Sequence, residues 1–123
     1  MLLTGSFEIS LEGKQDKQAP AGRMLINKKY SGGLEGAGIG QMLSKRVERG
    51  ASVYAAIEEF EGTVNGKKGS FTLYHTGFMS KSSQKLNITV VEGSGNGELE
   101  GIDGTLTITQ NNGIHTYRFE YNF

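Results

Sequence analysis

The sequence predicts an all-β protein, and two features of its 123 residues support this. In the last nine residues, 115–123, an aromatic ring or imidazole stands at every second position and a polar side chain at each position between. A period of two is typical of a strand with one buried and one solvent-facing side. The chain also has 19 glycines and 1 proline, which favours frequent tight turns over helical packing. Residues 98–101, a candidate turn, are the only helix-like segment.

Shorter versions of this alternation recur between polar or glycine-rich connections. In residues 3–12, small or apolar side chains occupy the odd positions and polar side chains the even positions. Residues 13–22 contain the only proline and five charged or amide side chains, so we expect a mobile polar loop there. The expected strands are residues 3–12, 23–31, 35–47, 52–61, 69–79, 84–92, 102–110 and 114–122.

The turns indicate how these strands are connected. Asn-Gly pairs supply the positive φ angles of two-residue hairpin turns, so Asn65-Gly66 and Asn112-Gly113 should each join antiparallel neighbours. Consecutive strands joined in this way predict an antiparallel up-and-down barrel of about eight strands, whose interior is either packed or holds one small ligand. We expect residues 1–123 to form this single domain, with a β-sandwich as the alternative fold.

Charge and composition limit the partners. Thirteen basic and thirteen acidic residues cancel, which argues against a nucleic-acid partner. There is no apolar run near the roughly 20 residues of a membrane span and no basic leader, so no membrane partner is expected and the protein should be soluble. The absence of cysteine suits a cytoplasmic location.

The common nucleotide and hydrolase motifs do not fit. The glycine-rich stretch 93–101 lacks the Lys-Ser or Lys-Thr of a phosphate-binding loop, and its glycine spacing is not that of a dinucleotide site. No Gly-x-Ser-x-Gly motif occurs either. We therefore predict no cofactor.

The candidate site residues are His75, His115, Tyr117 and Glu58. Both imidazoles fall on otherwise apolar strand faces, and Tyr117 shares the face of His115. If Glu58 also faces inward, a Glu/His/His set could bind zinc or transfer a proton. The opposite phase would bury Val53 and its alternate neighbours and leave Glu58 in water. A purely structural role for the histidines is the simpler alternative, and no metal site is adopted.

Three functions are compatible with this pattern. Apolar walls carrying a few polar groups are typical of small-molecule pockets, so the leading hypothesis is a barrel that binds a small, largely apolar molecule. The alternatives are a cyclase or isomerase acting on a hydrophobic substrate, and a non-catalytic interaction protein with a filled barrel. Outward positions Tyr74, Thr76 and Phe78 carry no charge, which predicts a homo-oligomer, in the simplest case a dimer.

Several segments carry a resemblance to a known family: Gly5-Ser-Phe7, residues 60–71, His75-Thr-Gly77, residues 91–102 and His115-x-Tyr117-x-x-x-Tyr121. Together they resemble a family of small bacterial proteins of unknown function, over nearly the whole chain. The resemblance implies an eight-stranded barrel similar to that of allene oxide cyclase, a relative of dirigent and lipocalin-like barrels. Proteins of that wider group hold a hydrophobic molecule inside the barrel, and some steer its cyclisation or coupling. No catalytic residue is carried over, because the cyclase residues have no matching motif here.

Overall fold

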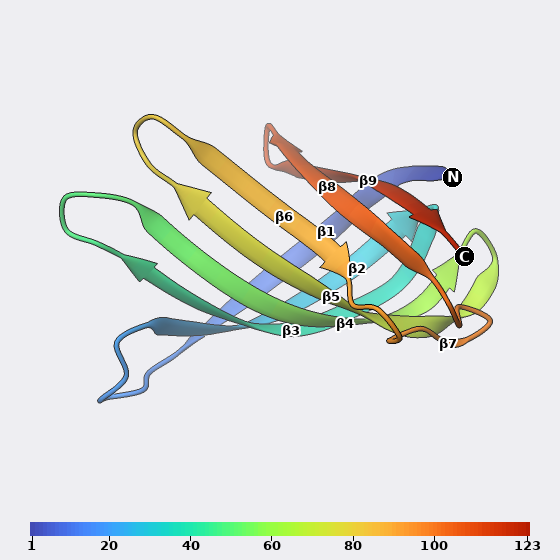
Figure 1. The fold of residues 1–123 in the computed structure, drawn as a ribbon, viewed down its shortest axis with the longest axis horizontal. Coiled ribbons are helices and arrows are strands. Elements are labelled where there is room, and N and C mark those ends of the chain that lie inside the picture. The colour runs from blue at the N-terminus through green and yellow to red at the C-terminus, as the bar shows by residue number, and fades with distance from the viewer.

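The computed structural model describes residues 1–123 as a closed antiparallel β-barrel without helices (Figure 1). Eight strands follow one another around the barrel, and β9 pairs with β1 to close it. The short β7 pairs with Gly69 and Ser70 near the start of β5. The predicted up-and-down barrel is confirmed. The strands are β1 (Leu2–Lys14), β2 (Gly22–Gly32), β3 (Leu34–Arg46), β4 (Ser52–Val64), β5 (Lys67–Met79), β6 (Gln84–Val90), β7 (Asn96–Gly97), β8 (Asp103–Asn111) and β9 (Ile114–Asn122).

The hairpin turns follow the local sequence chemistry. Asn65 and Asn112 have φ angles of 49° and 53°, and each is followed by a glycine with positive φ. These turns join β4 to β5 and β8 to β9, as predicted. Residues 98–101 form a turn and no helix. The polar connection between β1 and β2 is held by a bidentate ion pair, in which Arg23 donates to both carboxylate oxygens of Asp16 at 2.8 and 3.0 Å.

One end of the barrel is packed with aromatic rings. Phe60 stacks on Phe71 with ring centroids 4.9 Å apart, and Phe71 stacks on Phe119 at 5.7 Å. The connection between β6 and β8 packs Leu99 and Ile102, 0% and 2% exposed, into the same cluster. Aromatic rings supply much of the burial free energy of a small domain. This closed end is therefore the stabilising core of the fold.

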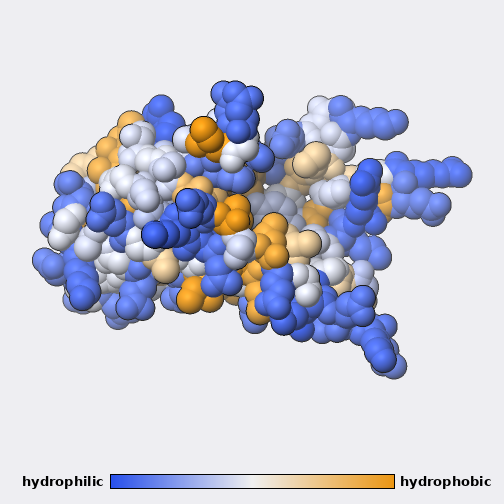
Figure 2. Space-filling model, turned by 180° about the vertical axis from the view of Figure 1, so that it is seen from behind, coloured by the Kyte–Doolittle hydropathy of each residue, from blue (hydrophilic) through white to orange (hydrophobic).

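The other end of the barrel is open. The connections β1–β2, β3–β4, β5–β6 and β8–β9 gather there. In Figure 1 the first three lie on the left and the β8–β9 turn lies at the top. The strand ladder thins at this end, since β1 pairs with β9 only over residues 2–7 and β6 meets β8 through the single pair Thr89–Thr105. Inward-phase Leu11, Met79 and Leu86 consequently remain 52%, 54% and 43% exposed. Figure 2, seen from behind, shows this end on the right as projecting arms with hydrophobic surface in the recess between them.

The alternation of β9 gives a direct test of the core. Phe119 is 0% exposed and Glu120 points outward. We expect Phe119→Ala to lower the free energy of unfolding by about 3–5 kcal/mol, because it truncates a buried aromatic ring, and Glu120→Ala to change it by roughly 0.5 kcal/mol or less. Urea melts of both variants measure this. Equal effects of the two substitutions would contradict the placement of this strand.

Candidate functional site

Glu58 is the buried carboxylate around which the candidate site forms. The sequence left two phases open for its strand, and the structure adopts the one with Ala56, Glu58 and Phe60 inside and Val53 and Ile57 outside. Glu58 is 0% exposed. The neighbouring strand β3 presents Gly38 and Gly40 inward, and a Cβ at Gly38 would collide with Glu58 Oε2. Glycine at this position therefore makes the room that the carboxylate needs.

Three side chains hold the Glu58 carboxylate. Lys28 Nζ lies 3.0 Å from Oε1 and His75 Nε2 lies 2.9 Å from the same oxygen. The hydroxyl of Tyr30 donates to Oε2 at 2.5 Å. All three are at most 6% exposed, and we call the four residues the Glu58 cluster. Lys28 and Tyr30 reach Glu58 across β3, because the β3 positions paired with them in register are Gly38 and Gly36.

Opposing effects set the ionisation of the cluster. Burial raises the pKa of Glu58, but the hydrogen bond from His75, the charge of Lys28 and the hydrogen bond from Tyr30 outweigh it, and the pKa lies below its ordinary value. Burial and the nearby carboxylate raise the pKa of Tyr30 far above its ordinary range. At neutral pH the cluster therefore holds an ionised Glu58 and a protonated Tyr30.

His75 has one nitrogen fixed by the carboxylate and one left over. An ionised carboxylate only accepts hydrogen bonds, so Nε2 of His75 carries the hydrogen that it shares with Glu58. Nδ1 makes no hydrogen bond within the protein. Because every fully buried side-chain nitrogen and oxygen has a hydrogen-bond partner, Nδ1 is not fully buried. Nδ1 consequently borders space that water can enter. An imidazole held in this way can accept a hydrogen bond or a proton at Nδ1.

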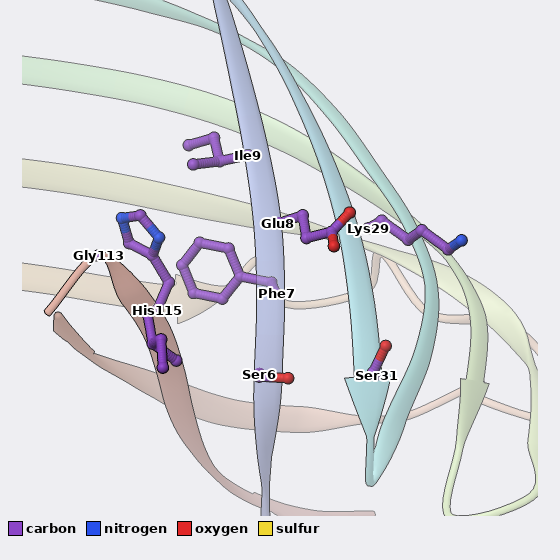
Figure 3. Close-up of a pocket in the computed structure, with 9 residues that line it drawn as sticks. Ser6, Phe7, Glu8, Ile9, Lys29, Ser31, Gly113 and His115 are labelled. Carbon is purple, nitrogen blue, oxygen red and sulfur yellow. The ribbon is translucent and has the colours of Figure 1, made fainter. Parts of the chain in front are cut away.

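His115 lies apart from the cluster, at the start of β9. It is half-buried, and its ring packs on Phe7 with centroids 5.1 Å apart. The same Phe7 ring lies 4.9 Å from Lys28 Nζ, so Phe7 lies between His115 and the cluster. Figure 3 shows the rings of His115 and Phe7 beside each other, with Glu8 and Lys29 directed away from them. These residues line an open depression of about 540 Å³ between β1 and the β8–β9 turn.

Tyr117 holds the backbone of the β2–β3 turn through its hydroxyl. Its hydroxyl accepts a hydrogen bond from the Leu34 amide at 2.8 Å and donates to the Ser31 carbonyl, also at 2.8 Å. These bonds tie the β2–β3 turn to β9. Side chains at Gly5 or Gly32 would crowd this hydroxyl. The hydroxyl is therefore occupied by the backbone of the protein.

Of the four predicted site residues, the structure brings together only Glu58 and His75. No three potential metal ligands come together, so the hypothetical Glu/His/His zinc set is not assembled. Lys28 and Tyr30 were missed. The available signal was the alternation Ile26, Lys28, Tyr30, which puts a lysine on a buried strand face. A lysine there requires an acidic partner inside the barrel.

A separate apolar pocket of about 200 Å³ opens at the mouth of the barrel. Its lining includes Met42, Tyr54, Met79 and Leu86 from the strands around the open end. The ring of Tyr54 lies over Gly77, where a Cβ would collide with it. Burial and the charge of Glu58 both raise the pKa of Tyr54. The Glu58 carboxylate therefore acts on a side chain that lines this pocket.

The chain belongs to the DUF3224 family, described as proteins of unknown function, whose family model matches residues 3–121. It is similar to the crystal structure, at 1.84 Å resolution, of a DUF3224 protein of unknown function from Shewanella oneidensis MR-1. The two share 37% sequence identity over 100% of this chain and 96% of the other, with a TM-score of 0.92. No functionally curated protein matches the sequence. No helix in the fold is long and apolar enough to cross a membrane.

The ion pair in the Glu58 cluster can be tested by a double-mutant cycle. Glu58→Gln should lower the free energy of unfolding by about 3–5 kcal/mol, because it leaves Lys28 buried without a counter-charge. Adding Lys28→Met to Glu58→Gln should recover part of that loss, since both charges are then absent. Urea melts at neutral pH measure the cycle. Strictly additive effects would show that the two side chains do not interact.

The lowered pKa of Glu58 predicts a pH dependence with a defined sign. A carboxylate whose pKa is lower in the folded state stabilises that state above its ordinary pKa of 4.5 and loses this effect as the pH falls through the folded value. The stability difference between wild type and Glu58→Gln should therefore shrink below about pH 4.5. Melts at a series of pH values measure this, and a difference that grows in acid would contradict the assignment.

Proposed function

We propose that the barrel binds a small, largely apolar molecule at its open end. The observation that carries this proposal is the set of apolar side chains that face the interior there and remain half-exposed, such as Leu11, Met79 and Leu86. Burying each of them against a ligand would be favourable by about 25 cal/mol per Å² of apolar area. Methionines Met24, Met42 and Met79 belong to this inward face, and their flexible side chains adapt to the shape of a ligand.

The pocket beside Tyr54 is the proposed binding position. Its volume of about 200 Å³ is below the range of roughly 300–1,000 Å³ for drug-sized ligands, so a short apolar body fits best. Tyr54 makes no side-chain hydrogen bond within the protein, and its hydroxyl is available to a polar group of the ligand. We therefore propose an apolar compound that carries one hydroxyl, carbonyl or carboxylate group.

The family supports the proposal by analogy alone. We extend the barrel assignment to the allene oxide cyclase-like group, in which barrels hold hydrophobic molecules. The lack of cysteine fits a cytoplasmic location within the same proposal. Because fold does not determine function, the pocket and the Glu58 cluster carry more weight than this analogy.

An isomerase or cyclase is the second candidate, favoured by the Glu58–His75 contact at 2.9 Å. A carboxylate that orients one imidazole nitrogen leaves the other able to take up and return a proton. An isomerase or cyclase of this kind requires His75 for turnover. Simple binding at Tyr54 requires His75 only for folding.

Thermal shift with octanoate, 2-octanone and 1-octanol tests the binding proposal. Binding to the folded state raises the melting temperature, and we expect a rise with at least one of these probes. Leu86→Lys should abolish it by placing a charge in the pocket, while Asn87→Lys, on the outer side of the same strand, should retain it. Tyr54→Phe should weaken binding by about tenfold, the effect of one hydrogen bond.

Two results would overturn the proposal. The first is no rise with any of the three probes, which would favour an interaction protein with a filled barrel. The second is an equal rise in wild type and Leu86→Lys, which would place the ligand elsewhere.

A further inference from the structure

The outer surface of β3, β4 and β5 carries an apolar face in which Gln41 and Thr76 are interspersed. Cross-strand register makes its members neighbours, with Ile57 beside Tyr74 and Val53 beside Phe78. These side chains point away from the barrel interior and cover no other part of the chain. The outer apolar face consists of Ile39, Leu43, Val53, Ile57, Tyr74 and Phe78, which are 62%, 51%, 46%, 61%, 50% and 41% exposed.

The opposite wall of the barrel is different. Outward positions on β8 include Thr105, Thr107 and Thr109, and those on β9 include Arg118 and Glu120, with Ile114 as an exposed apolar side chain beside the turn. A large contiguous apolar patch on an otherwise polar monomer marks an interaction site. The outer apolar face is thus the part of the surface best suited to an interaction.

Charges at the two ends of this face identify the partner. Toward the closed end of the barrel the face is bordered by Glu59 and Glu61 on β4. Toward the open end it is bordered by Lys45 on β3 and Lys85 on β6. One end is acidic and the other basic, so the face is complementary to an inverted copy of itself. The chain has no net charge that would oppose self-association.

We propose that two copies of this chain pack through the outer apolar face, related by a two-fold axis that lies in the interface and crosses β4 at Ile57. Glu61 and Val53 lie at equal distances along β4 on either side of Ile57, and Val53 pairs with Lys45. An axis perpendicular to β4 therefore places Glu61 opposite Val53 of the partner subunit, one strand away from Lys45 of the partner subunit. An axis parallel to β4 would instead oppose like charges. The interface is isologous, the commonest kind in homodimers.

The centre of this dimer face is separate from the proposed ligand pocket, and the two share only Val53, Phe78 and Lys85 near the open end. Successive side chains of a strand point to opposite faces, so the residues of the interface and those of the lumen alternate along β4. A substitution at Ile57 changes the outside of the barrel and leaves Glu58 and its partners in place. Ile57 does not line the ligand pocket, so its substitution measures loss of the dimer separately from loss of ligand binding.

Sedimentation equilibrium at micromolar concentrations tests the dimer. Wild type should have twice the chain mass of 13.3 kDa. Ile57→Lys should give the mass of one chain, because it places a charge at the centre of the interface. Thr107→Lys, an equally outward substitution on β8, should remain dimeric. Circular dichroism should show the same fold for all three proteins.

A charge exchange tests the symmetry of the interface. Glu61→Lys and Lys45→Glu should each weaken the dimer by severalfold, and the double variant should restore it, most clearly at low salt. A monomeric wild type would overturn the proposal, as would an Ile57→Lys variant that remains dimeric. If Ile57→Lys dissociates the dimer but the double variant fails to recover it, the two-fold arrangement is wrong.

Discussion

The carboxylate of Glu58 is the constraint on which the middle of the barrel depends. An ionised group with no exposure is costly unless hydrogen bonds and an opposite charge replace water, and here β2 and β5 supply both. The glycines of β3 let the β2 side chains reach it. Four neighbouring strands are thus coupled through one side chain. Below this level the barrel is filled by aromatic rings, and above it the interior opens.

The division between a filled and an open half has a functional meaning. The aromatic stack gives the fold its stability, so the strands at the mouth need not pack tightly against one another. Residues that bind or react can then lie at the open end, where fewest strand pairs form. The Glu58 cluster lies between the two halves, with polar chemistry facing the mouth and the hydrophobic core behind it.

Local patterns predicted the strands and hairpins, but the site depended on tertiary pairing. Alternation and Asn-Gly turns are properties of adjacent residues, and all eight main strands were found where they predict them. The phase of β4 was ambiguous because its outer face is also apolar, so Ile57 and Phe60 compete in the pattern. Lys28 was missed because its contact with Glu58 exists only once β3 lies between their strands.

The part of β1 beyond Phe7 has a neighbour on one side only. Its free backbone groups form a strand edge, and such edges recruit strands from other chains into aggregates. This edge carries Glu8, Glu12 and Lys14, and Glu12 and Lys14 pair at 3.2 Å. Charged side chains along an edge oppose its pairing with another strand. The barrel can therefore leave these strands unpaired at its open end and still resist amyloid-like stacking.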